Sequence, residues 1–230
     1  MNARWVACLA VFLFCSACTT TDMRIAGDAG SFNARGAKVL VVYPEVQLGL
    51  LTANGMTELR EDWSQASAGN LALALRAALS AKSLTYEELD PQASMAGRIG
   101  QVLRLNSTVG QSIELFEYGP YKLPSKEGRF EWTLGDGAKA LGANHGARYA
   151  LFVSGRGTFT SGGRMALAVG AAILGVAIPV GSQHVYVSLV ELETGRVIWF
   201  NVANAGDGTD VRTPEGARSI VDELVESAPL

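Results

Sequence analysis

Apolar residues along the chain occur either in short runs or at helical spacing, and the runs predict a sheet. The nearly continuous apolar runs at Lys38–Tyr43 and Tyr149–Val153 are typical of strands buried on both faces. Since both runs are attached to helical segments, we expect them to be neighbouring central strands. A further strand is predicted over Ser83–Leu89, and Val46–Thr52 is predicted to be an edge strand or a loop.

Apolar residues at helical spacing predict four helices. The first runs to Lys82 and begins with a serine cap, at Ser64 or Ser67. The others are predicted over residues 94–116, over residues 134–144 with Gly146 as the stop, and from Pro214 onward.

A β-hairpin is predicted near the end of the chain. Two strands, His184–Leu192 and Arg196–Asn201, flank Glu193-Thr194-Gly195, where the glycine suits a tight turn. The order of elements is then β, α, β, α, α, β, β-hairpin, α. This order predicts a single α/β domain in which helices cover a mixed β-sheet.

The first eighteen residues have a pattern of their own. Arg4 precedes an apolar stretch that is too short to span a bilayer, and small residues follow it, as in a secretory signal. The ending Cys15-Ser-Ala-Cys18 resembles the lipobox of bacterial lipoproteins, although Cys15 stands where leucine is usual. In that family a diacylglycerol is attached to the cysteine and the chain is cut just before it. The resemblance implies a mature chain that starts at lipidated Cys18; the alternative is an ordinary signal peptide cut after Ala17.

These patterns divide the chain into three parts. Residues 1–17 are predicted to be a lipoprotein signal peptide, 18–36 a lipidated flexible tether, and 37–230 an α/β periplasmic domain. Thr19 directly follows the cysteine. By the same lipoprotein resemblance, it implies anchoring at the periplasmic face of the outer membrane.

Cysteine content and charge narrow the classes of partner. All three cysteines lie at or before Cys18, so we expect neither a disulfide nor a cysteine metal cluster in the mature domain. Removing residues 1–17, with one arginine and no acids, leaves 18 basic against 22 acidic residues, a net charge of −4. The basic residues are scattered, so the pattern disfavours nucleic acid. Membrane contact is expected through the acyl chains on Cys18.

Two segments carry a second resemblance. Residues Gly142–Val153 (GANHGARYALFV) and Val185–Trp199 (VYVSLVELETGRVIW) resemble the helix–strand step and the later hairpin of a group of envelope lipoproteins. The group includes the curli-secretion-channel lipoprotein, the lipoprotein activators of penicillin-binding proteins and the amino-terminal domain of the Tol–Pal translocation protein. The resemblance implies a mixed-sheet α/β fold and a role in assembly, secretion or cell-wall regulation through protein contacts. This chain departs from the group by Glu191 in place of Asp and by an apolar insert before the hairpin.

That insert, Met165–Gly181, carries no charge. As a helix it would extend roughly 25 Å, short of the ~30 Å hydrocarbon core of a bilayer. Three interpretations remain open: a connection buried under the sheet, an apolar hairpin that touches the membrane or another copy, or an exposed patch that docks a partner. The predicted membrane or partner contacts are Ile173, Leu174, Val176 and Ile178.

Candidate chemistry elsewhere is sparse. The glycine-rich stretch Gly155–Arg164 lacks the Lys-Ser/Thr ending of a phosphate-binding loop, and His145 and His184 are isolated. Other groups considered are the serines Ser154 and Ser161, the acidic cluster Glu87, Glu88 and Asp90, and the aromatic loop residues Tyr118, Tyr121 and Trp132. None forms a recognised catalytic motif, so no catalytic residue, cofactor or metal is predicted.

The sequence therefore predicts an outer-membrane-anchored periplasmic lipoprotein that acts as a non-catalytic binding or assembly module of the cell envelope. Its expected partners are the membrane, through Cys18, and envelope proteins or further copies of itself. The alternative is an envelope enzyme, such as a hydrolase, whose active site is dispersed along the chain.

Overall fold

The computed structural model describes residues 20–27, 34, 36–91, 96–205 and 209–230. Within them, nine strands form one mixed sheet whose main path is β1-β9-β8-β7-β2-β5; in addition β3 pairs with β4 and β7, and β6 pairs with β9. The strands are β1 (Thr20–Ile25), β2 (Val39–Val42), β3 (Glu45–Leu51), β4 (Thr57–Leu59), β5 (Tyr86–Leu89), β6 (Trp132–Thr133), β7 (Tyr149–Thr160), β8 (Gln183–Glu191) and β9 (Arg196–Ala205). The helices are α2 (Glu61–Ala81), α4 (Gly97–Ile113), α5 (Ala138–His145), α6 (Gly162–Ile173) and α7 (Pro214–Glu226), with a π-helix η3 (Glu114–Tyr118) and a 3-10 turn η4 (Pro124–Lys126).

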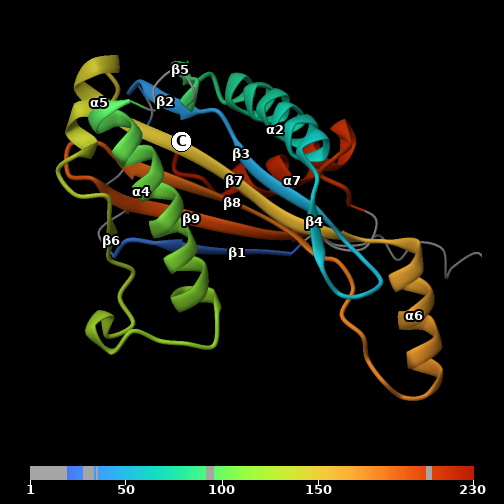
Figure 1. Cartoon of the computed structure of the whole chain (residues 1–230). Helices are drawn as coiled ribbons and strands as arrows, with labels where there is room; N and C mark the ends of the chain where they lie inside the picture. Colours follow the sequence, from blue (N-terminus) through green and yellow to red (C-terminus); the bar gives the residue numbers. More distant parts are fainter. Residues whose placement is uncertain (1–19, 28–33, 35, 92–95, 206–208) are drawn as a thin grey trace, which may run out of the picture.

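Helices cover the sheet, as predicted, and they do so on both faces (Figure 1). On one face α2 and α7 pack side by side, and their buried residues include Leu71 and Leu224. On the other face α4 and α5 pack over Phe152. Successive residues of a strand point to opposite faces, so the continuous apolar run of β2 supplies both cores. The predicted α/β class with a mixed sheet is confirmed.

The two central strands are neighbours, as predicted. Strand β2 pairs in parallel with β7, with Val39 opposite Tyr149, and β5 lies on the other side of β2. Strand β7 is twelve residues long. Its second half pairs with β3, which resumes the direction of β2 after Pro44. The segment predicted as an edge strand or a loop is therefore a strand.

The predicted hairpin and helix ends are also confirmed. Strands β8 and β9 pair antiparallel, and Gly195 in their turn has φ = 71°. A side chain at this position would meet the carbonyl oxygen of Gly135 at 2.2 Å. Helix α5 ends at Gly146, which adopts the left-handed conformation, and α7 begins at Pro214 after the Thr213 cap.

Two predictions are corrected. Residues Thr20–Ile25 belong to the segment predicted as a flexible tether, but they form β1, which pairs antiparallel with β9 along its whole length. Most of these side chains are exposed, so their attachment to the sheet leaves no apolar pattern in the sequence. Helix α2 begins at Glu61, a turn before the predicted serine cap. The Ser64 hydroxyl instead accepts a hydrogen bond from the Leu48 amide at 3.0 Å.

Candidate functional site: an apolar hairpin and a cleft

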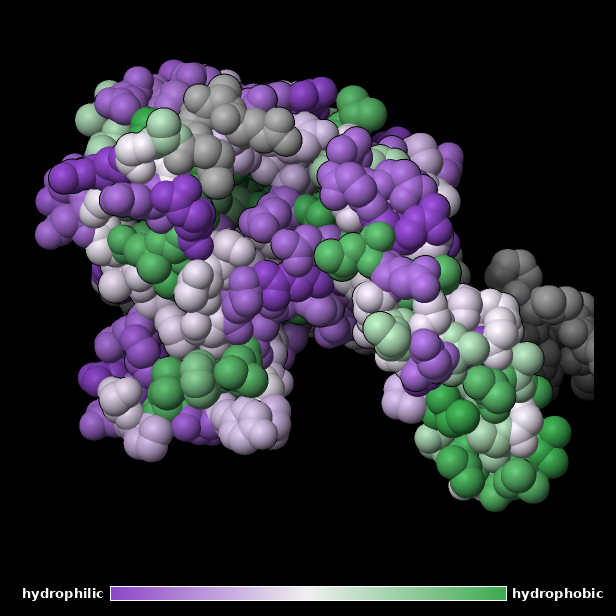
Figure 2. All heavy atoms as spheres, in the orientation of Figure 1, coloured by the Kyte–Doolittle hydropathy of each residue, from purple (hydrophilic) through white to green (hydrophobic). Residues whose placement is uncertain are grey.

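The most exposed apolar surface lies on residues 161–182, which join β7 to β8 and are here called the apolar hairpin. Figure 1 shows α6 projecting away from the end of the sheet, with the irregular segment that returns to β8 beside it. Figure 2 shows hydrophobic spheres gathered over this projection, in contrast to the mixed surface of the sheet domain. The hairpin contains the charge-free segment that the sequence singled out.

Local sequence explains why the hairpin forms. The Ser161 hydroxyl caps α6 by accepting a hydrogen bond from the Arg164 amide at 3.3 Å. Alanine, leucine and methionine then favour helix. The helix stops before Gly175, whose φ of 77° suits glycine, and the Val176 amide closes the end on the carbonyl of Ala171 at 2.9 Å.

Hydrogen bonds fix the base of the hairpin to the sheet and join its two arms. The Thr158 amide donates to the carbonyl of Ser182 at 2.8 Å, and the Gly181 amide donates to the Thr160 hydroxyl at 2.6 Å. The Arg164 Nε donates to the Pro179 carbonyl at 2.9 Å and so joins the helix to the return segment. The hairpin therefore continues the β7–β8 ladder.

The predicted contact residues lie on this projection. Ile173 and Leu174 are 82% and 81% exposed, Val176 is 54% exposed, and Ile178 is half-buried. Helix α6 has no buried residue. The interpretation of this segment as a connection buried under the sheet is therefore wrong, whereas the two exposed interpretations remain. Among the described residues, no helix is long and apolar enough to cross a bilayer.

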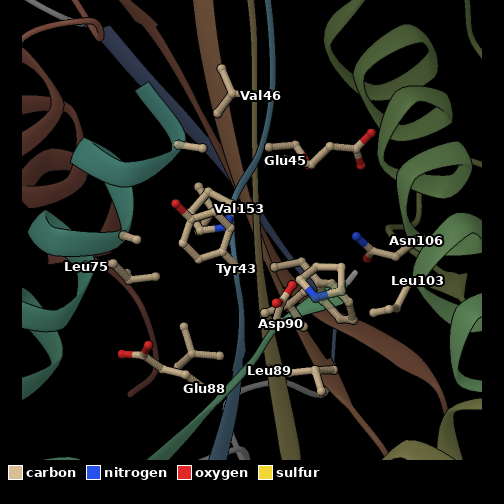
Figure 3. Close-up of a pocket in the computed structure, with 18 of the residues that line it drawn as sticks. Tyr43, Glu45, Val46, Leu75, Glu88, Leu89, Asp90, Leu103, Asn106 and Val153 are labelled. Carbon is tan, nitrogen blue, oxygen red and sulfur yellow. The ribbon is translucent and has the colours of Figure 1, made fainter. Parts of the chain in front are cut away.

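A cleft of about 980 Å³ lies between α2 and α4 (Figure 3). It exists because neighbouring strands cover this edge incompletely. Strand β5 pairs only with Val39–Val42, and β4 only with Gly49–Leu51, so residues 45–48 of β3 have a strand partner only in β7. Because β5 is short, it leaves a gap, which α2 and α4 border.

Apolar and polar side chains both line the cleft. Leu75 of α2 and Leu103 of α4 lie on opposite sides of it (Figure 3). The lining also includes Asn106 and Ser154, which are buried polar residues. Such a lining suits a ligand or extended peptide with both apolar and polar groups. This feature was missed from the sequence because its lining residues come from six helices and strands.

Glu88 lies at the rim of this cleft. The Arg76 guanidinium binds its carboxylate in a bidentate pair, with Nη2 to Oε2 at 2.6 Å, and holds the pKa of Glu88 below its usual range. On the same strand Glu87 accepts from Lys38 at 2.6 Å and lies 2.8 Å from His145, and its pKa is also lowered. These residues of the predicted acidic cluster therefore hold elements together through ion pairs.

A second titratable pair lies near the base of the hairpin. The Nε2 of His184 is 3.3 Å from Oε1 of Glu114, at the junction of α4 with the π-helix η3. Burial raises the pKa of Glu114 to about 7, against a smaller opposing effect of Arg156. Burial also lowers the pKa of His184. These shifts favour the neutral form of each side chain. Residues this far apart in sequence gave no signal of their contact.

The remaining sequence candidates have structural roles. Gly155 and Gly157 lie inside β7, where a side chain at Gly157 would meet the Ser182 carbonyl at 2.8 Å, so they form no phosphate loop. Trp132 donates to Glu117 at 2.9 Å and Tyr118 packs on Phe200, so these aromatics anchor their loop. Among the described residues, no three histidine, aspartate, glutamate or cysteine side chains are grouped for a metal. Cys18 lies outside the described residues, and its lipidation stays a prediction.

Comparisons with known proteins define no family. No protein-family model matches the chain, and no curated protein sequence matches it. Among solved structures, the chain is similar to the PelC dodecamer from Paraburkholderia phytofirmans, with 14% identity over 92% of this chain and 98% of that one and a TM-score of 0.41. It is also similar to the LpoB C-terminal domain from Salmonella enterica, with 16% identity over 77% and 87% of the two chains and a TM-score of 0.31. At such low TM-scores these likenesses carry no conclusion about function.

Proposed function

We propose that this chain is an outer-membrane-anchored periplasmic lipoprotein that acts as a non-catalytic binding or assembly module of the cell envelope. Two features support the proposal. The sequence ends its signal-like segment at Cys18, in the manner of a lipobox. The fold then presents an apolar hairpin that its own core does not cover.

The exposed hairpin is the observation that carries the proposal. Large apolar side chains such as Ile173 and Leu174 each gain about 1.5–3 kcal/mol when they leave water. A soluble domain rarely keeps such residues together on a projection unless they contact something. We therefore expect the hairpin to be covered in the cell, by the membrane, by envelope proteins or by further copies of the chain. The function of the protein would then depend on this contact.

A second candidate function is suggested by the cleft between α2 and α4. Its volume of about 980 Å³ and its buried Asn106 and Ser154 are compatible with a small ligand or with an envelope hydrolase. Soaking or titrating the protein with cell-wall peptides and glycans, followed by amide chemical shifts of Asn106 and Ser154, would distinguish this candidate. A hydrolase would also turn the substrate over.

Thiol labelling in living cells tests the main proposal. Ile173→Cys places one reactive thiol on the hairpin of the mature chain, since Cys18 would be acylated. Leu73→Cys is the matched control, because Leu73 is 61% exposed on α2, away from the hairpin. We expect a water-soluble maleimide that enters the periplasm to label residue 73 and spare residue 173. Equal labelling would mean that the hairpin faces water in the cell, and the contact-module proposal would fail.

A further inference from the structure

Helix α6 is apolar on all sides. Leu167 and Val169 are two positions apart, hence about 200° apart around the helix, and are 51% and 57% exposed. No residue of α6 is buried, and from Met165 to Ile173 it carries only apolar or small side chains. A helix that is apolar all round normally lies in a protein core or in lipid, and here the core does not hold it.

This distribution favours lipid over a second protein. A protein interface covers one face of a helix and leaves the opposite face in water, so it selects an amphipathic pattern. Exposed apolar groups on opposite sides of α6, together with Ile173 and Leu174 at its tip, match a medium that is apolar in every direction.

The length of the hairpin matches one leaflet. Twelve residues at about 1.5 Å each give α6 a length of about 18 Å. The hydrocarbon core is ~30 Å thick, so half of it is about 15 Å. The hairpin can therefore fill one leaflet without spanning the membrane.

The hairpin leaves the sheet at the end where the lipid would be attached. Thr20 of β1 and His184 of β8 are both opposite Asn204 of β9, and His184 is opposite Arg156 of β7. The hairpin begins only a few residues beyond Arg156. Cys18 precedes Thr20 by two residues, which allows at most about 7 Å of separation along the chain. An acyl group there would hold this end of the sheet at the membrane surface.

Charge along the hairpin agrees with this placement. Its one charged residue is Arg164, at the base, where Nε is bonded to the Pro179 carbonyl. A guanidinium at this level is suited to the phosphate groups of the membrane surface, while the uncharged part beyond it is suited to acyl chains.

We infer that the apolar hairpin inserts into the same leaflet that holds the acyl chains of Cys18, so that the domain is attached at two points. The inference rests on the proposed lipid anchor. The acyl chains hold the protein to the membrane, and the hairpin stops the domain from rotating about that anchor. The surface of the apolar hairpin therefore contacts the acyl chains of phospholipids. The sheet domain then keeps one orientation toward the periplasm.

Fluorescence from a labelled hairpin tests the inference in the lipidated chain. An environment-sensitive nitrobenzoxadiazole group is attached at Ile173→Cys, and at Leu73→Cys as the control. Each protein is reconstituted with vesicles of phosphatidylethanolamine and phosphatidylglycerol. We expect the emission at residue 173 to increase, to shift to shorter wavelength and to be quenched by lipids with nitroxides on their acyl chains. The emission at residue 73 should not change.

A second variant separates insertion from folding. Leu174→Asp in the labelled Ile173→Cys chain should weaken the response, because one buried leucine contributes roughly a tenfold to hundredfold preference for an apolar phase. Circular dichroism melts establish that this variant is folded. If the hairpin inserts, the blue shift of the label should be weaker in the Leu174→Asp variant, while the melting temperature is unchanged.

Two results would overturn the inference. One is flotation of the protein with vesicles while residue 173 keeps its emission in water, which would leave the anchor intact and the hairpin outside the lipid. The other is a blue shift without vesicles that grows with protein concentration, which would identify a second copy as the occupant. A mass spectrum of the purified parent without acyl groups on Cys18 would instead contradict the proposed lipid anchor.

Discussion

The imidazole of His184 lies 3.3 Å from the carboxyl group of Glu114, although seventy residues separate them in sequence. His184 is the second residue of β8, and Glu114 is the first residue of the π-helix that extends α4. Their contact joins the covering helix to the strands that carry the apolar hairpin. Because both side chains are largely buried, their protonation is linked to folding.

A pH dependence follows from Glu114. Its pKa is raised from 4.5 to about 7 in the folded protein, so the folded state keeps a proton that the unfolded chain releases. The stability it contributes is full below about pH 4.5 and is lost as pH rises through about 7. The lowered pKa of His184 acts in the opposite direction, but only below its ordinary value of 6.5. Between about pH 6.5 and 8 the effect of the Glu114 carboxyl is therefore not offset by His184.

We expect the parent to lose about 0.8 kcal/mol of unfolding free energy between pH 6.5 and 8, and Glu114→Gln to lose much less. Urea unfolding at several pH values measures this difference. Glu117→Gln on the same π-helix is the control. An equal pH slope in the parent and in Glu114→Gln would show that Glu114 is not the group responsible.

The lipid anchor gives the second prediction. Cys18→Ala removes the predicted acylation site, so uncut precursor should accumulate, and any cut protein should bind the membrane more weakly, through the apolar hairpin alone. Mass spectrometry of the parent should show acyl groups on Cys18. Unchanged processing of the variant, together with a parent that carries no acyl group on Cys18, would refute the lipoprotein interpretation.

A core substitution tests the central strands. Phe152 is 3% exposed, under α4 and α5 on the β7 strand. Phe152→Ala should lower the unfolding free energy by about 3–5 kcal/mol, because it leaves a cavity. Leu73→Ala, at an exposed site of α2, should change it by no more than about 0.5 kcal/mol. Similar small effects for both variants would contradict the central placement of β7.

The hydroxyl of Ser64 provides a finer test. It accepts from the Leu48 amide at 3.0 Å in the interior, and Leu48 has a strand partner only on the β7 side. Ser64→Ala leaves this amide without its partner and should cost about 1–3 kcal/mol. Hydrogen exchange at the Leu48 amide should become faster in the variant. Unaltered exchange would show that this bond does not hold β3 against α2.

Long apolar runs and tight turns were predictable from the sequence, because a single local signal determines each of them. The runs at β2 and β7 are buried on both faces and therefore stay apolar throughout. Gly195 and Gly146 occupy left-handed conformations that favour glycine. Such features depend little on the rest of the fold.

Other features depend on tertiary contacts and left no local signal. Strand β1 is attached through its backbone at a sheet edge, so its exposed side chains resemble those of a tether. A serine near a helix start, such as Ser64 or Ser67, is typical of a cap, but the Ser64 hydroxyl accepts a hydrogen bond from a strand residue sixteen positions earlier. The cleft and the Glu114–His184 pair each join distant segments. For the apolar hairpin, the composition could be read from the sequence, but its exposure to solvent could be established only from the fold.

Vesicle binding of the mature chain with Cys18→Ser, which cannot be acylated, tests the central claim most directly, because the apolar hairpin is then the predicted membrane contact. We expect this chain to float with phosphatidylethanolamine and phosphatidylglycerol vesicles, and the added pair Ile173→Asp and Leu174→Asp to reduce the partition coefficient roughly 100-fold or more. The unfolding free energy should stay within about 0.5 kcal/mol, since both side chains are exposed. Equal vesicle binding with and without the two aspartates, at equal stability, would contradict the account.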